Sequence, residues 1–180
     1  MVLLIRSLSI MIIVAFSKVC LAHDTNIATF HISQIAEQEW IYEVMTPLYN
    51  LDRSARATNK ALSPADTKSI QYKQEIIAYI KQGFDVKVSG YDDKKVSVNA
   101  AGLTLGKGRI KLDDHLSVLI FKIKGMPKSV KEIEFHITNM SEHLRHNNIF
   151  RIIKGRKNKH FLLNKENNFS GRVTTFLSKE

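Results

Sequence analysis

Residues 84–124 read FDVKVSGYDDKKVSVNAAGLTLGKGRIKLDDHLSVLIFKIK, and they carry the clearest pattern of secondary structure in the chain. This segment holds several short runs rich in β-branched and aromatic residues, separated by turn-forming groups such as Gly90–Asp93 and Gly106–Gly108, the latter read as a hairpin turn. Short runs at this regular spacing are typical of an all-β sandwich. The pattern continues toward the C-terminus, past the turn segments 125–127 and 155–158. In this region we expect strands at 85–89, 95–98, 102–105, 109–112, 116–124, 133–138, 149–154, 160–163 and 173–177.

Two further strands precede this region. In residues 28–32, apolar side chains alternate with Thr29 and His31, which is the period of a half-buried strand. The run WIYEVM (residues 40–45) reads as its neighbour and ends before Pro47.

A helical segment separates the early strands from the late ones. Ser63, followed by Pro64 at the first helical position, marks a helix start. Isoleucines then recur at helical spacing in residues 70–80 until Gly83, and residues 51–61 form a weaker helix candidate. The sequence therefore predicts a mainly β fold, an antiparallel, immunoglobulin-like β-sandwich with one or two helices between early and late strands.

The N-terminus has the pattern of a cleavable secretory signal. Arg6 supplies the positive region, residues 8–16 supply a short apolar run, and Ala22 closes a small-residue cleavage site. We expect residues 1–22 to be the signal peptide and residues 23–180 to be a single β-rich domain. The chain is then periplasmic or secreted.

Processing also changes the composition. Cys20 is the only cysteine, so the mature chain has no disulfide. Loss of Arg6 and Lys18 with the signal lowers the formal net charge from +10 to +8. A basic exported protein is attracted to anionic surfaces, although net charge does not determine its fold.

Three segments carry a resemblance to a known group of proteins. They are HDTNIATFHISQ (residues 23–34), GRIKLDDHLSVLIFKIKGMP (residues 108–127) and NNIFRIIKGRKNKHFLLNKENNF (residues 147–169). Together they resemble a family of small uncharacterised secreted proteins of Gram-negative bacteria, whose mature chains start with histidine. The resemblance implies an exported β-rich domain and no particular activity.

One group of residues suggests a transition-metal site. Cleavage before His23 would place a free α-amine beside an imidazole, and nitrogen and oxygen donors of this kind suit Cu(II), with zinc also possible. Asp113 and His115 are two residues apart, so an extended segment would place both on one side. His31 is the next candidate ligand. The alternative for Asp113 and His115 is an ordinary turn between two strands, and for His31 a surface histidine with no role.

The basic run forms a second candidate site, for an anionic envelope surface. It consists of Arg151, Lys154, Arg156, Lys157 and Lys159. Its alternative is a charged hairpin tip that keeps exposed strands from pairing with neighbours. Nucleic acid is an improbable target for an exported chain. No catalytic constellation is visible: the mature chain has no cysteine and no G-x-S-x-G motif.

The sequence thus leaves two hypotheses open. The first is an exported copper or zinc carrier that uses His23 with one or more of His31, Asp113 and His115. The second is a non-catalytic cell-envelope interaction domain that docks on a partner protein or surface through its basic surface or a sheet edge.

Overall fold

The computed structural model describes residues 27–59, 67–92, 94–143 and 146–174. The expected signal peptide and His23 lie outside these residues. In chain order the elements are β1 (Ile27–Ala36), β2 (Glu39–Thr46), α2 (Leu48–Thr58), α3 (Ile70–Gln82), β3 (Phe84–Gly90), β4 (Lys95–Val98), the short 3₁₀ turn η1 (Ala100–Gly102), β5 (Leu103–Lys111), β6 (Ser117–Ile123), β7 (Val130–Ile137), β8 (Asn147–Lys154), β9 (Lys157–Leu163) and β10 (Ser170–Val173).

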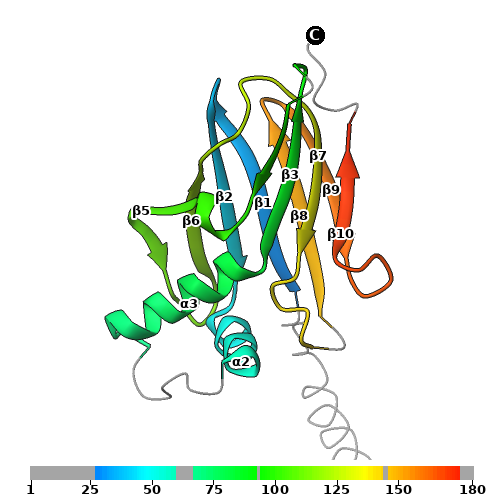
Figure 1. Ribbon diagram of the computed structural model, residues 1–180. Helices are drawn as coiled ribbons and strands as arrows, with labels where there is room; N and C mark the ends of the chain where they lie inside the picture. Colours follow the sequence, from blue (N-terminus) through cyan, green and yellow to red (C-terminus); the bar gives the residue numbers. More distant parts are fainter. Residues whose placement is uncertain (1–26, 60–66, 93, 144–145, 175–180) are drawn as a thin grey trace, which may run out of the picture.

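The strands form two sheets that pack face to face (Figure 1). One sheet has six strands in the order β5–β6–β2–β1–β8–β9, and the other has four in the order β10–β7–β3–β4. Helices α2 and α3 come between β2 and β3 in the chain. The expected β-sandwich with a helical insertion between early and late strands is confirmed.

The core lies between the sheets because the strands alternate. In β2, Trp40, Tyr42 and Val44 are buried, and the residues between them are half-exposed. Ring centroids of Tyr42 and Phe84, which come from opposite sheets, are 4.5 Å apart. Burial of each large side chain of this kind contributes about 1.5–3 kcal/mol.

One strand pair departs from the expected antiparallel pattern. β1 pairs with β2 antiparallel but with β8 parallel, so that His31 lies opposite Glu43 on one side and Arg151 on the other. A parallel pair needs a crossover connection, and here both helices and most of the second sheet lie in that connection. β1 thereby becomes a central strand of the larger sheet.

The expected hairpin at Gly106–Gly108 was wrong. Residues on both sides of it belong to one strand, β5, and both sides pair with β6. The register shifts between Leu105 and Ile110, where Gly108 has a φ of 68°. The extra residues therefore make an irregular bulge in an edge strand.

The expected hairpin between β8 and β9 does form. Lys154 pairs with Lys157, and Gly155 in the turn has a φ of 58°. At the C-terminal end, β10 begins before the expected strand 173–177 and shares only Val173 with it, and residues 175–177 lie outside the described residues.

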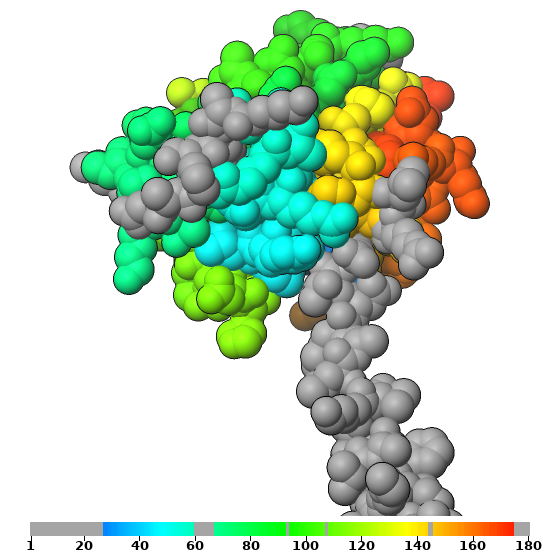
Figure 2. Space-filling view, turned by 90° about the horizontal axis from the view of Figure 1, so that it is seen from below, coloured from blue at the N-terminus to red at the C-terminus, as the bar shows by residue number. Residues whose placement is uncertain are grey.

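The helices lie at one end of the sandwich, and Figure 2 shows α2 at the centre of that end with α3 beside it. Helix α3 starts later than the sequence suggested. Its N-cap is Ser69, whose hydroxyl accepts from the backbone N–H of Tyr72 at 3.1 Å. Ser63 and Pro64 lie outside the described residues, and residues 67–69 are not helical. No described helix is long and apolar enough to cross a membrane.

A buried asparagine fixes the end of α3 to the smaller sheet. Asn139 Nδ2 donates to the carbonyl oxygens of Tyr79 and Ile80 at 3.0 and 3.2 Å. Its own backbone carbonyl accepts from Asn148 Nδ2 at 2.6 Å. The two bonds from Nδ2 go to carbonyls of the last turn of the helix, where the backbone N–H of Gly83 also donates to the carbonyl oxygen of Tyr79 at 3.4 Å.

Candidate functional site

Asp113 and His115 form a turn between β5 and β6. Asp113 Oδ1 accepts from the backbone N–H groups of His115 and Leu116 at 3.0 and 3.4 Å, and Lys111 Nζ lies 3.4 Å from Oδ2. The backbone bonds, first of all the one from His115, hold the pKa of Asp113 below its ordinary value. This is the turn geometry that the sequence left as the alternative, and both carboxylate oxygens are engaged in it.

His31 lies at the centre of the six-stranded sheet with its imidazole enclosed. Nδ1 lies 3.3 Å from Glu43 Oε2, and Nε2 is buried without a hydrogen-bond partner among the described residues. Burial lowers the pKa of His31, and the charge of Arg151 lowers it further, against the opposing effect of Glu43. Neither ring nitrogen is thus open to a metal ion from solvent.

The structure does not bring the proposed metal ligands together. The row of residues through His31 crosses β6 at Ile120, whereas Asp113 bonds Ser117 at the start of β6. That separates them by roughly 10 Å along the strands and roughly 10 Å across two strand spacings. Among the described residues, no three His, Cys, Asp or Glu side chains gather as a metal site requires. His23 lies outside the described residues.

The basic run is divided between the two faces of the β8–β9 hairpin. Arg151 points away from the core because Phe150 and Ile152 beside it are buried. Lys159 lies on the opposite face, with Nζ 5.7 Å from the centroid of the Phe161 ring. Lys154, Arg156 and Lys157 lie at the turn of the hairpin. The run is therefore not one continuous cationic surface.

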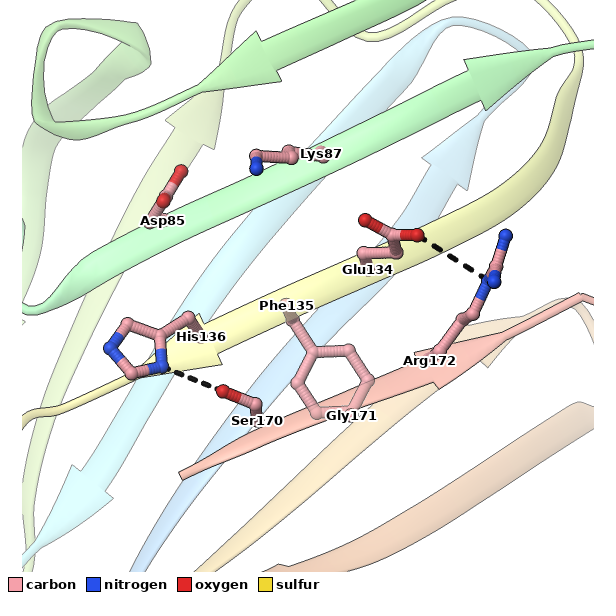
Figure 3. A pocket seen from close by; sticks show the side chains of 8 residues that line it. All are labelled: Asp85, Lys87, Glu134, Phe135, His136, Ser170, Gly171 and Arg172. Carbon is pink, nitrogen blue, oxygen red and sulfur yellow. Dashed lines mark hydrogen bonds and ion pairs between the residues drawn. The ribbon is translucent and has the colours of Figure 1, made fainter. Parts of the chain in front are cut away.

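An open groove of about 390 Å³ lies on the outer face of the four-stranded sheet (Figure 3). Asp85, His136 and Ser170 lie side by side there on β3, β7 and β10. His136 Nδ1 and Ser170 Oγ are 2.7 Å apart. Asp, His and Ser are the residue types of a serine hydrolase. Ser170 could act as a nucleophile only if its hydroxyl donated its proton to the histidine.

The hydrogen bonds place that proton away from the histidine. Ser170 Oγ donates to the carbonyl oxygen of Asn168 at 2.9 Å. In the contact with His136, the serine oxygen is therefore the acceptor and Nδ1–H is the donor. A serine nucleophile needs the reverse arrangement. The groove also holds Arg172, which bonds Glu132 at 2.7 Å and lies 3.4 Å from Glu134, so its charge is already neutralised.

The outer faces of the two sheets differ sharply. The face of the four-stranded sheet is polar throughout and consists of Asp85, Lys87, Ser89, Lys95, Ser97, Glu132, Glu134, His136, Ser170 and Arg172. The face of the six-stranded sheet carries large apolar side chains among its polar residues, and we call seven of them, on β2, β6, β8 and β9, the outer apolar face: Ile41, Met45, Val118, Ile120, Ile149, Ile153 and Leu162. All seven lie outside the core that fills the sandwich; Leu162 is 53% exposed, and the other six are half-buried.

One charged row crosses the middle of the outer apolar face. Glu43, His31 and Arg151 lie on the neighbouring strands β2, β1 and β8, with Ile120 and His160 at the two ends of the row. The side chain of Glu43 is 25% exposed, and that of Arg151 is exposed. Within the described part of the chain, no ion pair involves Arg151.

The sheet edges are poor docking sites, in contrast to this face. β9 exposes Lys157 and Lys159, and β5 is broken by its bulge. β4 and β10, the edges of the smaller sheet, have four residues each. Lysines, bulges and short edge strands are the features that keep sheet edges from pairing with other chains.

Sequence reasoning missed the outer apolar face, although the sequence carries a signal for it. The runs VLIF (residues 118–121) and IFRII (residues 149–153) are apolar at almost every position. Strands buried on both faces read in this way, whereas strands with one solvated face alternate. The face itself is visible only once the register of five strands is known.

Comparison with known proteins adds no family. Neither a family model nor a curated protein matches this chain. The resemblance to the secreted Gram-negative family therefore stays a prediction.

Proposed function

We propose that this chain is a non-catalytic interaction domain, exported to the periplasm or beyond, that docks on a partner through the outer apolar face. The observation that carries the proposal is the contrast between its two outer sheet faces: one is polar throughout, and the other carries seven large apolar side chains among its polar residues. Large apolar side chains gathered on one outer face of a protein mark an interaction site, whereas single apolar residues scattered over a surface do not.

The other candidates have less support from the geometry. In the Ser170–His136 pair the serine hydroxyl donates to the carbonyl oxygen of Asn168, and Asp113 is engaged in a turn. His31 is enclosed by its neighbours. The outer apolar face has the composition of a buried surface, and no competing use of its residues within the described fold explains that composition.

Site-specific photocrosslinking tests the proposal. A benzoylphenylalanine is placed at Ile120, in the outer apolar face, or at Lys87, on the polar face of the other sheet, in cells that express the full chain. We expect a discrete ultraviolet-dependent adduct from position 120 and none from position 87, because docking buries only the apolar face.

A second change makes the result specific. Ile149→Glu, on the same face as Ile120, should abolish the adduct, since one carboxylate in a desolvated interface costs several kcal/mol. Ser97→Glu on the polar face serves as the matched control and should leave the adduct intact. Equal adducts from positions 120 and 87, or an adduct that survives Ile149→Glu, would contradict the proposal.

A further inference from the structure

The outer apolar face is self-complementary about its central strand. A two-fold axis that lies between two such faces and runs nearly parallel to β1 exchanges β2 with β8 and β6 with β9. β2 and β8 are each one strand spacing from β1, about 4.8 Å. Glu43 of one copy then lies opposite Arg151 of the other, and this contact occurs twice.

The apolar residues match under the same operation. Met45 meets Ile149, Ile41 meets Ile153, and Val118 meets Leu162 of the other copy. Two pairs at the outer strands are not apolar on both sides: Ile120 lies opposite His160, and Lys122 lies opposite Asn158.

The residues on the axis allow the sheets to approach. Thr29, His31 and Ser33 of β1 each meet their own counterpart. Thr29 and Ser33 are small, and His31 is only 8% exposed. The side chains of β1 therefore protrude less than the larger ones on both sides of them. This suits the face-to-face separation of about 10 Å that packed sheets adopt.

We propose that the outer apolar face binds the same face of a second copy of this chain, forming a two-fold symmetric dimer in which Glu43 pairs with Arg151. The inference rests on the proposed function, since it names the partner of that surface. The charge pattern favours a second copy over an unrelated protein, because acid and base lie at equal distances on opposite sides of the central strand.

The size of the face sets the strength of the dimer. Five strands and three rows cover roughly 24 by 20 Å, so two copies bury on the order of 1,000 Å². That lies at the lower end of specific interfaces. The dimer should therefore be reversible, with a dissociation constant in the micromolar range.

Charge reversal and mixing test the dimer. The exported chain, purified from expressing cells, is followed by sedimentation velocity between about 1 and 200 µM, a range that brackets micromolar association. Glu43→Lys places lysine opposite Arg151, and Arg151→Glu places two acids opposite each other. Each should weaken self-association at least about tenfold.

An equimolar mixture of Glu43→Lys and Arg151→Glu tests whether residues 43 and 151 face each other across the dimer. In a mixed dimer, the lysine introduced at position 43 of one chain would face the glutamate introduced at position 151 of the other, and the unchanged Arg151 would face the unchanged Glu43. Association should therefore return, with the mass of a 1:1 dimer. Arg156→Glu, at the exposed hairpin turn, makes the same charge change as Arg151→Glu away from the face and should associate like the natural chain.

The outcomes separate the two proposals. Failure of the mixture to associate, or a natural chain that stays monomeric at the highest concentration, would overturn the dimer. If the crosslinker at position 120 then captures a different protein in a way that Ile149→Glu abolishes, docking through the face stands with another partner. If neither association nor crosslinking occurs, both proposals fail. Circular dichroism establishes that both charge variants are folded, and the mixture itself reports a contact that misfolding cannot restore.

Discussion

His31 links the charged row to the stability of the fold. Burial lowers its pKa below the ordinary value of 6.5, with Arg151 on β8 acting in the same direction and Glu43 on β2 opposing it. Between the two pKa values the unfolded chain binds more protons than the folded chain. The neutral, buried state of His31 therefore makes its full contribution to the free energy of unfolding above about pH 6.5. The free energy of unfolding falls as the pH drops toward the pKa of His31 in the folded chain, by at most about 1.4 kcal/mol per pH unit.

Urea unfolding at about pH 7.5 and 5.5, which span the ordinary histidine pKa, measures this loss. His31→Gln should reduce the loss without removing it, because burial also lowers the pKa of His143. His115→Gln, at an exposed position in the turn between β5 and β6, makes the same change away from the charged row and is the matched control. An identical pH dependence in the natural chain and His31→Gln would show that His31 does not contribute.

Asn139 shows what a single buried amide contributes. Its Nδ2 donates to two carbonyls at the end of α3. Asn139→Asp replaces that donor with a group that accepts at both positions, so we expect a loss of about 2–4 kcal/mol in the free energy of unfolding. Asn147→Asp makes the same chemical change at an exposed position and should cost less than about 0.5 kcal/mol. Similar losses in the two variants would mean that Asn139 does not anchor the helix.

At the scale of elements, β10 packs closely on β7 because Gly171 has no side chain. A Cβ at position 171 would lie 2.5 Å from the Phe135 ring, which packs against Phe150 and Phe161 in the core. Gly171→Val should therefore cost about 1–3 kcal/mol by overpacking. Chemical denaturation measures this cost. The double variant with Phe135→Leu should cost less than the sum of the two single variants, because the smaller side chain leaves room for the valine. Strictly additive costs would show that the two residues do not interact.

The elements themselves were largely predictable, because strands and turns are local patterns. Alternation in residues 28–32 and the turn at Gly155 are enough to identify β1 and the β8–β9 hairpin from the sequence alone. The parallel pairing of β1 with β8 was not predictable, since it joins segments more than a hundred residues apart. The bulge near Gly108 was misread as a hairpin because glycine marks both kinds of irregularity.

The candidate site was less predictable than the fold, and the reason lies at the scale of the whole molecule. Sequence reasoning selected residues with individual chemistry, such as His31, Asp113 and Arg151. The outer apolar face has ordinary residues whose meaning comes from the register of five strands. Of these three residues, His31 and Arg151 lie in the charged row that crosses the outer apolar face.

The dimer also predicts how stability depends on concentration. Binding that occurs only between folded chains raises the free energy of unfolding by mass action. A hundredfold rise in concentration above the dissociation constant adds about 1.4 kcal/mol per chain, or about 2–5 °C in the melting temperature of a domain of this size. Differential scanning calorimetry across that range should show the rise for the natural chain and for Arg156→Glu.

Arg151→Glu alone should show a smaller rise of the melting temperature over the same range, because repulsion at the charged row weakens its self-association. Mixing it with Glu43→Lys should restore the dependence. A mixture that melts as the sum of its two components would exclude pairing between Glu43 and Arg151 in the folded state. A rise shared equally by the natural chain and Arg151→Glu would place self-association on another surface of the molecule.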